Sequence, residues 1–403
     1  MKIHVIGTGG REHAIGWAFW RKKHEVFYYP GNAGTKKHGR NIPYEGLKTI
    51  KKICSEDSII IPGSEIYIVE GISNICDRSL APTKEAARLE SSKVFAKLFM
   101  KKYGIRTPRF EIVENPEQLD DTLRKFSPPY VLKIDGLARG KGVILADNFQ
   151  EALEKGKLLM RGEYIKGVKG MLVVDEYMNG YELTAIALVN NRKFTILPFV
   201  RDYKKIGDND TGPNTGGMGA WGPVKVSDNL RNRIEELFDK TLYGLEKEGL
   251  DYKGFLYLGL MIVDEEPYIL EYNVRLGDPE GEVIISMNPE NFVSLVLSTF
   301  EGRMEEFKPL HYVVDVVLAS EGYPEKPRTG QKVVIPEGNI SKESILFYGA
   351  VKEINGELIV TGGRVLHCIG IGEALESARE NAYELARKVV FDGKYFRKDI
   401  AFQ

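Results

Sequence analysis

The sequence has few cysteines and histidines and almost no net charge. Among its 403 residues are 3 cysteines and 6 histidines, and the formal net charge is −1. A chain with this balance has no global field that favours nucleic acid or an anionic membrane. The cysteines and histidines form no CxxC, HxH or HxxxH pair, so we do not expect a zinc site. Cys54, Cys76 and Cys368 lie among apolar residues, and we expect buried free thiols in a reducing compartment.

Long apolar runs, internal repeats and low-complexity tails are also missing from the sequence. No apolar run approaches the ~20 residues that are needed to span a bilayer. The first segment, MKIHVIGTGG, turns polar after six residues and does not have the pattern of a secretory signal. The length suits about two to four domains. We therefore expect a cytoplasmic protein of enzyme size that binds neither nucleic acid nor a membrane.

The first part of the chain alternates between strand and helix patterns. Short apolar runs predict strands, and helical periodicity predicts the helices between them. Strands are expected at 2–6, 25–29 and 57–61, and helices at 12–23, 45–54 and 65–76. This alternation is typical of a doubly wound parallel sheet, and we expect such an α/β domain over residues 1–90.

The remainder has α+β patterning, which we divide into two domains. Helices are expected at 84–103, 116–125, 148–160, 227–248, about 290–301 and 373–390. Strands are expected at 109–113, 130–134, 142–146, 171–176, 181–189 and 193–201, and a hairpin at 254–263 and 267–275. We expect a middle domain over 91–305, which includes a smaller unit at about 108–178, and a strand-rich C-terminal domain over 306–403.

The stretch GDNDTGPNTGGMG at 207–219 is polar, rich in glycine and flanked by apolar strands. A compact domain rarely keeps so long a polar loop unless the loop binds something. Its glycines let the backbone approach a ligand, and Lys204 and Lys205 just before it can meet anionic groups. A loop without function on the surface is the alternative.

A second glycine-rich turn, Gly7 to Gly10, follows the first predicted strand and opens a helix. Such a turn exposes backbone N–H groups to anions. Position 12 holds Glu12, where a dinucleotide-binding turn needs glycine or alanine, so nicotinamide binding is disfavoured. A phosphate or phosphosugar site fits better, with 31–35 as a second loop at the same edge of the sheet. The alternative is a tight βα turn.

Residues 131–145 place lysines around a glycine-rich loop. Lys133 and Asp135 share one face of a strand, and the loop from Gly136 to Gly142 carries Arg139 and Lys141. A Walker loop would open a helix, whereas this loop joins two strands. The pattern favours a glycine hairpin that covers the phosphates of ATP.

Two further segments offer polar groups on strands. Glu271, Asn273 and Arg275 point to one face, where the carboxylate and amide oxygens could hold Mg²⁺. A solvated sheet face is the alternative. In 173–183, the linker from Glu176 to Met178 could present backbone groups to adenine, and Glu182 could reach ribose hydroxyls.

Together these motifs resemble the ATP-grasp superfamily and, more closely, its phosphoribosylamine–glycine ligase family, the glycinamide ribonucleotide synthetases. The resemblance runs nearly end to end, and its motifs are GGREHA at 9–14, PGNAGT at 30–35, PTKEAARLESSKVFAK at 82–97, KIDGLARGKGV at 133–143, GDNDTGPNTGGMGA at 207–220, EYNVRLGDPE at 271–280 and GGRVL at 362–366. It implies an N-terminal Rossmann-like domain, an ATP-grasp domain with a lid, and a strand-rich C-terminal domain.

The resemblance also implies an activity and a site. ATP would drive the ligation of glycine to 5-phosphoribosylamine through glycyl phosphate, in purine biosynthesis, with Mg²⁺ or Mn²⁺ and in a monomer. The implied catalytic residues are Asp202, Lys204 and Arg275, and the implied metal ligands are Glu271 and Asn273. The implied ATP-binding residues are Lys93, Lys133, Gly136, Gly140, Lys141, Gly142, Glu176, Tyr177, Met178 and Glu182. The implied substrate-binding residues are Gly9, Gly10, Arg11, Glu12, Asn32, Asn214, Thr215, Gly216, Gly217 and Asp278.

The chain departs from the family pattern in places. Gly63 to Ile66 stands where the family usually has Pro-Glu-x-Pro, and Arg201 to Lys205 where it has Gln-Asp-His-Lys-Arg. A related ligase that activates formate or bicarbonate, and a non-catalytic nucleotide-binding protein, are the alternatives.

Overall fold

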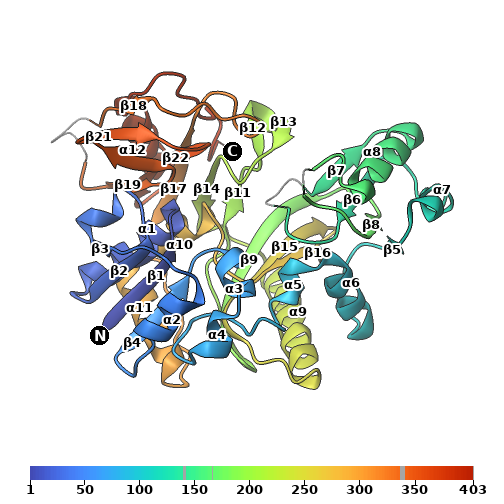
Figure 1. Ribbon diagram of the computed structural model, residues 1–403, viewed down its shortest axis with the longest axis horizontal. Coiled ribbons are helices and arrows are strands. Elements are labelled where there is room, and N and C mark those ends of the chain that lie inside the picture. The colour runs from blue at the N-terminus through green and yellow to red at the C-terminus, as the bar shows by residue number, and fades with distance from the viewer. Residues whose placement is uncertain (139–141, 166, 336–340, 403) are drawn as a thin grey trace.

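The N-terminal part forms the expected parallel sheet. The computed structural model describes residues 1–138, 142–165, 167–335 and 341–402. Strands β1 (Lys2–Gly7), β2 (Glu25–Pro30), β3 (Arg40–Asn41) and β4 (Ser58–Pro62) run in the order β3-β2-β1-β4. β1 and β4 are almost fully buried, as their apolar, β-branched runs suit strands of a parallel sheet that is covered on both faces. Helices α1 (Gly10–Arg21), α2 (Leu47–Ile53), α3 (Glu65–Val69) and α4 (Ile72–Ile75) accompany the sheet (Figure 1).

The single helix predicted at 65–76 is wrong, because the chain breaks it into α3 and α4. Gly71 has a φ of +93°, a conformation that glycine adopts without strain but that ends a helix.

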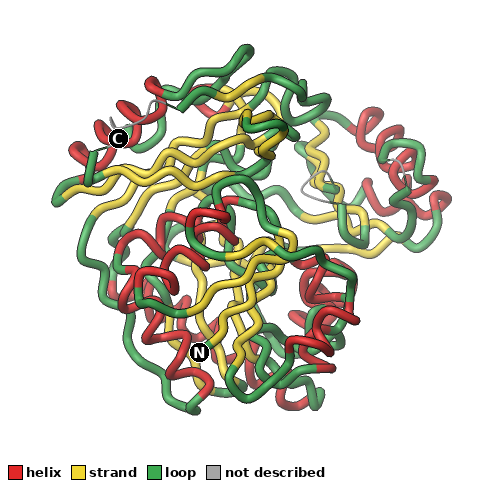
Figure 2. Tube along the Cα trace, turned by 60° about the vertical axis from the view of Figure 1, so that its left-hand side comes forward, coloured by secondary structure: helices red, strands yellow, loops and turns green. Residues whose placement is uncertain are grey.

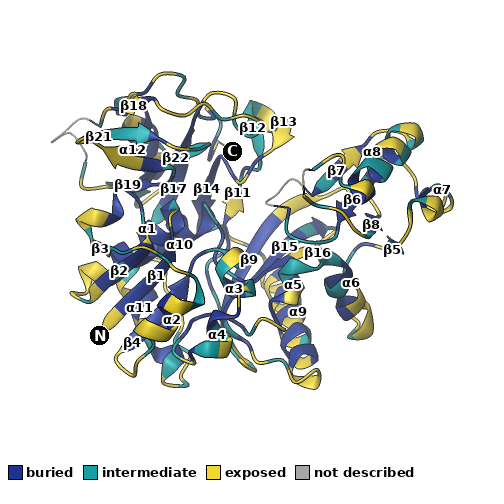
Figure 3. Cartoon of the chain, viewed as in Figure 1, coloured by how far each residue is buried: buried dark blue, intermediate teal, exposed yellow. Residues whose placement is uncertain are grey.

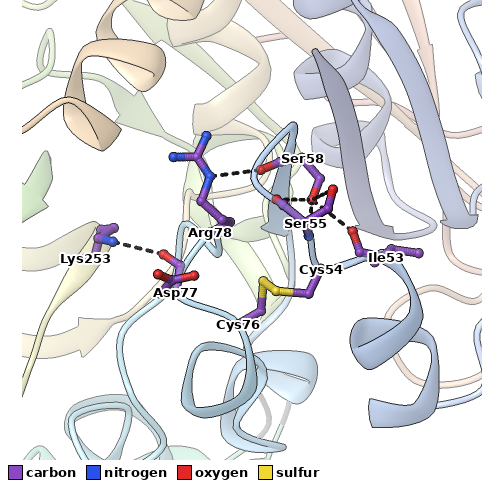
Figure 4. The surroundings of a disulfide bond; sticks show 8 residues. All are labelled: Ile53, Cys54, Ser55, Ser58, Cys76, Asp77, Arg78 and Lys253. Carbon is purple, nitrogen blue, oxygen red and sulfur yellow. Dashed lines mark hydrogen bonds between the residues drawn. A yellow bond between two sulfur atoms is a disulfide. The ribbon is translucent and has the colours of Figure 1, made fainter.

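Cys54 and Cys76 form a disulfide, so the prediction of free thiols is wrong for these two residues (Figure 4). They follow the last residues of α2 and α4, and the fold brings their Cα atoms to 5.8 Å although 22 positions separate them in sequence. This pairing depends on how the two helix ends meet, which local sequence does not reveal. Cys368 is a buried free thiol, as expected. Of the three cysteines, Cys368 alone fits the free thiols expected in a reducing compartment.

A four-stranded antiparallel unit stands off to one side of the molecule (Figures 1 and 2). It consists of β5 (Phe110–Val113), β8 (Leu172–Asp175), β6 (Tyr130–Ile134) and β7 (Val143–Ala146), in that order, with α7 (Leu119–Leu123) and α8 (Phe149–Arg161) packed on it. Before it, the helix predicted at 84–103 divides into α5 (Arg88–Ser91) and α6 (Lys93–Lys102). Ser92 between them has extended backbone, and its hydroxyl caps α6 by accepting a hydrogen bond from the Phe95 N–H.

A second antiparallel sheet lies at the centre of the molecule. Its order is β10 (Lys193–Ile196), β9 (Tyr181–Asn190), β15 (Lys253–Val263) and β16 (Glu266–Asn273), and α9 (Asp228–Lys247) packs on it. The hairpin between β15 and β16 confirms the prediction, although β16 ends at Asn273. Figure 3 shows β9 and β15 as largely buried. Both strands are rich in apolar residues on both faces, which suits a sheet covered on two sides.

The sheet nearest the C-terminus includes strands from the middle of the sequence. Its order is β11 (Arg201–Asp202), β14 (Gly219–Gly222), β17 (Tyr312–Ala319), β22 (Arg364–Gly372) and β19 (Ser344–Tyr348), with α12 (Leu375–Lys388) on one face. A small sheet of β18 (Lys332–Val333), β21 (Glu357–Val360) and β20 (Val351–Ile354) lies beside it. Helices α10 (Glu280–Met287) and α11 (Pro289–Phe300) follow the central sheet, and α10 contacts α1, β14 and β17.

The polar stretch 207–219 is not a featureless loop. β12 (Lys205–Gly207) and β13 (Thr211–Asn214) form an antiparallel hairpin, and Asn209 and Asp210 at its turn have φ values of 55° and 54°. Asn and Asp tolerate this left-handed conformation better than other side chains. Within the described residues, no helix is long and apolar enough to cross a membrane.

Candidate active site

Two lysines share one buried carboxylate at the junction of the four-stranded unit and the central sheet. Lys133 Nζ on β6 lies 2.8 Å from Asp175 Oδ2 and donates to the Leu270 carbonyl at 2.9 Å. Lys97 Nζ on α6 lies 2.8 Å from Asp175 Oδ1. Burial, followed by the charge of Lys133, lowers the pKa of Lys97 to about 8 despite Asp175. With two cations on one anion, this group can accept a further anionic ligand. Lys97 and Asp175 were not predicted as site residues.

Lys93 sits at the N-terminus of α6, beside the start of the glycine loop. Its Nζ donates to the Gly136 carbonyl at 3.0 Å, and burial lowers its pKa. The shared strand face of Lys133 and Asp135 suggested that the two act together, but Asp135 has other partners. It accepts hydrogen bonds from the Ser92 hydroxyl and the Val94 N–H at 3.0 and 3.1 Å, which ties α6 to the end of β6. Gly136 has a φ of +99°, so this turn requires glycine.

The remaining loop residues are only partly described. A Cβ at Gly142 would lie 2.6 Å from the Ala138 Cβ, so the loop is close-packed at that point. Arg139, Gly140 and Lys141 lie outside the described residues.

The end of β16 places the Glu271 carboxylate near several cationic side chains. Burial alone would raise the pKa of Glu271, but Lys204, Lys133 and Lys93 around it hold that pKa below its ordinary value. Glu271 is therefore ionised at neutral pH, and Asn273 Nδ2 lies 3.5 Å from its Oε1. The Glu271 carboxylate and the Asn273 amide each carry hard oxygens, and the two residues share one strand face, as predicted. The Asn273 oxygen accepts a hydrogen bond from Arg275.

Arg275 is held by two glutamates from the N-terminal part of the chain. Its Nη2 lies 3.3 Å from Glu90 Oε1 and donates to Asn273 Oδ1 at 3.1 Å, and its Nε lies 3.5 Å from Glu65 Oε2. Burial raises the pKa of Glu90 to about 7 even though Arg275 opposes this shift. Glu65 and Glu90 were not predicted as site residues, although Glu90 lies within a quoted motif.

A third charged group joins β11 to the central sheet. Lys204 Nζ pairs with the Asp202 carboxylate, and this pairing raises the pKa of Lys204 against the effect of its burial. The Tyr257 hydroxyl donates to Glu280 Oε1 at 2.9 Å. Burial, reinforced by Asp202, raises the pKa of Glu280, and burial also raises that of Glu182 on β9. Tyr257 and Glu280 were not predicted, although Glu280 ends a quoted motif.

Glu12 accepts a hydrogen bond from within the glycine turn after β1. The Gly9 N–H donates to Glu12 Oε2, and Arg11 Nη1 donates to the Leu276 carbonyl at 2.8 Å. A Cβ at Gly63 would lie 1.8 Å from Glu12 Oε1, so the departure from the family pattern at 63 makes room for this side chain. Arg11 and Glu12 therefore frame the turn through contacts within the protein.

Asn32 joins the turn after β2 to the turn after β1. Its Nδ2 donates to the carbonyls of Thr8 and Tyr348, and its Oδ1 accepts from the Gly34 N–H at 2.9 Å. The amide is thus fully used within the protein.

Asp278 lies where the C-terminal sheet meets the glycine stretch. Arg364 Nη1 lies 2.9 Å from Asp278 Oδ1 and donates to the Gly216 carbonyl at 2.8 Å. The cations Arg364 and His367 outweigh burial and lower the pKa of Asp278 to about 2. Arg364 was missed as a site residue, although it lies within the quoted motif at 362–366.

His367 lies beneath this group among buried carboxylates. Its Nδ1 is 2.8 Å from Asp315 Oδ2 and 3.5 Å from Glu282 Oε1. These carboxylates outweigh burial and raise the pKa of His367 to about 9. Asp278, Glu282 and His367 offer ligand atoms within 4.8 Å of one another, but the guanidinium of Arg364 already pairs with Asp278. We interpret the group as an internal ion-pair network.

The predicted adenine linker joins β8 to β9. The Glu176 N–H donates to the Arg109 carbonyl at 2.8 Å, and Tyr177 is exposed. Met178 follows in the same linker, before β9 begins at Tyr181. The linker therefore borders the lysine group through Asp175.

Two antiparallel sheets meet at the site: Lys133 on β6 contacts β16, Lys93 contacts the glycine turn after β6, and β16 carries Glu271 and Asn273. This is the arrangement of an ATP-grasp ligase. Family models described as the Phosphoribosylglycinamide synthetase N domain, ATP-grasp (A) domain and C domain match residues 1–90, 91–281 and 313–403. The chain belongs to the phosphoribosylglycinamide synthetase family.

Individual relatives agree with this assignment over the full length. The chain is 59% identical to phosphoribosylamine–glycine ligase of Thermotoga maritima, over 100% of this chain and 99% of that protein. The ligase of Clostridium acetobutylicum is 37% identical, over 99% of each chain. A crystal structure of the Thermotoga maritima ligase has a TM-score of 0.94, with 56% identity, and covers 99% of this chain and 100% of that one. An ADP complex of N5-carboxyaminoimidazole ribonucleotide synthetase, at 16% identity and a TM-score of 0.67, shares the fold, with 95% of this chain and 96% of that one covered.

Proposed function

We propose that this protein joins glycine to 5-phosphoribosylamine and converts ATP to ADP and phosphate, as a step of purine biosynthesis. A carboxylate is a poor acyl donor until one of its oxygens becomes part of a phosphate leaving group. The glycine carboxylate would therefore attack the γ-phosphorus of ATP, and the bond from that phosphorus to the bridging oxygen would break to release ADP. The amine of phosphoribosylamine would then attack the carbonyl carbon of the acyl phosphate, the C–O bond to phosphate would break, and the nitrogen would lose a proton. The protein's contribution is positioning, neutralisation of charge and exclusion of water.

The group around Asp175 is suited to ATP. Lys133 and Lys93 would contact its phosphates, and the turn from Gly136 to Gly142 would cover them, with Gly140 and Lys141 in that turn. The linker Glu176, Tyr177 and Met178 would present backbone groups to adenine, and Glu182 would bind the ribose. Lys133 and the linker both adjoin Asp175, which supports a single nucleotide site.

Glu271 and Asn273 would hold Mg²⁺ or Mn²⁺. Glu271 is ionised and both residues offer hard oxygens, so they fit either ion. When bound, the metal would neutralise charge on the phosphates of ATP. Lys93 and Lys133, two of the lysines near Glu271, would orient the same phosphates.

Glycine is a zwitterion, and Asp202 and Lys204 form a pair that matches it. Asp202 would accept hydrogen bonds from the glycine ammonium, and Lys204 and Arg275 would face its carboxylate. Asn214, Thr215, Gly216, Gly217 and Asp278 would line the path to phosphoribosylamine, and Gly9, Gly10, Arg11, Glu12 and Asn32 would lie at its phosphate end. The bond from Arg364 to Gly216 supports this continuity, because it links the glycine stretch to Asp278.

We further propose the division into domains at 1–90, 91–305 and 306–403, with the lid at about 108–178, for a cytoplasmic monomer. The separate packing of the unit from β5 to β8 supports a lid that closes over ATP.

The observation that carries the proposal is Glu271, ionised among Lys93, Lys133 and Lys204. Its test is ADP release from Mg·ATP with no addition, with glycine, with phosphoribosylamine and with both. We expect release with both substrates only. ADP release with formate or bicarbonate and another amine instead would overturn the assignment of the substrates. ATP binding without turnover in any mixture would favour a non-catalytic protein.

A further inference from the structure

The end of the chain lies against the polar hairpin of β12 and β13, as Figure 1 shows beside the mark for the C-terminus. The Tyr395 hydroxyl donates to the Ile206 carbonyl at 2.9 Å. The Lys398 N–H donates to Asp208 Oδ1 at 2.8 Å. These contacts join residues almost 190 positions apart at the edge of the proposed substrate site.

Arg397 is the centre of this contact. Its side chain is fully buried, and Nη1 donates to the Lys205 carbonyl at 3.0 Å and to Asp210 Oδ1 at 2.9 Å. Nε and Nη2 donate to the two oxygens of Asp399 at 2.8 and 2.6 Å. The guanidinium also lies 4.8 Å from the ring centre of Tyr203. A buried guanidinium is stable only when its N–H groups are paired, so these partners fix its position and, through it, the hairpin.

Hydrogen bonds continue from the hairpin into the glycine stretch. The N–H and the hydroxyl of Thr215 both donate to the Lys204 carbonyl, at 2.7 and 2.8 Å. The Gly217 N–H donates to Thr215 Oγ1 at 2.9 Å. Lys204 adjoins Lys205, which Arg397 holds. Arg397 therefore holds the residue next to Lys204, and hydrogen bonds connect Lys204 to Thr215 and Thr215 to Gly217.

We propose that Arg397 is a positioning residue for the two substrates other than ATP. It touches no proposed substrate position and acts through the backbone from Lys204 to Gly217. The inference rests on the proposed function for its kinetic consequences. The proposed ATP residues lie on α6, on β6 and the glycine turn after it, in the linker after β8 and at the start of β9. The contacts of Arg397 given above reach none of these. Loss of Arg397 should consequently raise the KM values for glycine and phosphoribosylamine but not the KM for ATP.

The test compares Arg397→Met with wild type in the full-length protein. Because a misplacement of about 1 Å can cost about 100-fold, we expect the KM for glycine and for phosphoribosylamine to rise at least about tenfold. The KM for ATP should stay within about twofold. Arg379→Met is the matched control, since Arg379 also holds the C-terminal end, at the Ala401 carbonyl and the Phe402 ring, and its contacts do not include the hairpin. It should leave all three KM values near wild type.

A milder variant keeps the test valid if Arg397→Met does not fold. Asp210→Asn removes the charge that meets Arg397 at an exposed turn, and Asn tolerates the left-handed backbone there. It should raise the same two KM values by a smaller factor. An equal rise in all three KM values, or no rise in either variant, would overturn the proposal.

Hydrogen exchange distinguishes failure of this inference from failure of the proposed function. Amides of residues 203–217 should exchange about tenfold faster in Arg397→Met, while those of 93–102 and 130–134 keep wild-type rates. Unchanged exchange at 203–217 would overturn the positioning role whatever the activity. If exchange at 203–217 is faster in Arg397→Met but the wild-type protein has no ligase activity, the proposed function alone would be overturned.

Discussion

At the scale of single residues, Glu271 is the carboxylate whose pKa is lowered by Lys204, Lys133 and Lys93 together. Its replacement by glutamine removes one metal ligand and the charge that balances Lys93, Lys133 and Lys204. We expect Glu271→Gln to lower kcat for ligation at least about 100-fold, the size seen when one electrostatic group of a site is lost. The control is Glu266→Gln at the other end of β16, where Glu266 pairs with Arg106 and Arg233. Equal activity of the two variants in an ADP-release assay would contradict the role of Glu271.

His367 makes stability depend on pH. Its pKa is raised from 6.5 to about 9 in the fold, so its contribution is complete below pH 6.5 and is lost as the pH rises toward 9. We expect the free energy of unfolding in urea to fall by at most about 3 kcal/mol between pH 6.5 and 9 through His367. His367→Gln should flatten this slope; a slope identical to that of wild type would refute the assignment.

At the scale of elements, the disulfide between the ends of α2 and α4 is a stabilising link away from the proposed site. It closes a loop across 22 positions, and loop closure of this size contributes about 3 kcal/mol. We expect Cys76→Ser, or a reductant, to lower the melting temperature while the KM values remain unchanged. The same reductant should have no effect on the Cys54→Ser, Cys76→Ser double variant. A melting temperature that reduction does not change would show that the disulfide does not contribute to the stability of the fold.

Elements with a clear periodic pattern were predictable, and the others depended on tertiary contacts. β1, β4 and the hairpin of β15 and β16 follow from apolar runs and turn residues, and the sequence placed Glu271 and Asn273 on one face. α10 was missed because it is buried all round, so it has no polar face to set a helical period. The break at Ser92 arises because its hydroxyl caps α6 and contacts Asp135, a residue more than 40 positions away.

At the scale of the whole molecule, distant parts of the chain meet at the site, and sequence reasoning found only some of them. The resemblance implied roles for Lys133 and Asp278, which lie in quoted motifs, and for Lys204, which lies just before one. Glu65, Tyr257 and His367 were missed because their relevance comes from what packs against them: Arg275, Glu280 and Asp315 respectively. The pairing of Cys54 with Cys76 was missed for the same reason.

The proposed mechanism requires glycine to be activated as an acyl phosphate before the amine attacks. The most direct test is turnover with glycine labelled with ¹⁸O in both carboxylate oxygens, followed by mass analysis of the phosphate released. One carboxylate oxygen leaves with the phosphoryl group in this mechanism, so each phosphate should carry one ¹⁸O atom. Unlabelled phosphate, formed while glycine is ligated, would contradict the account.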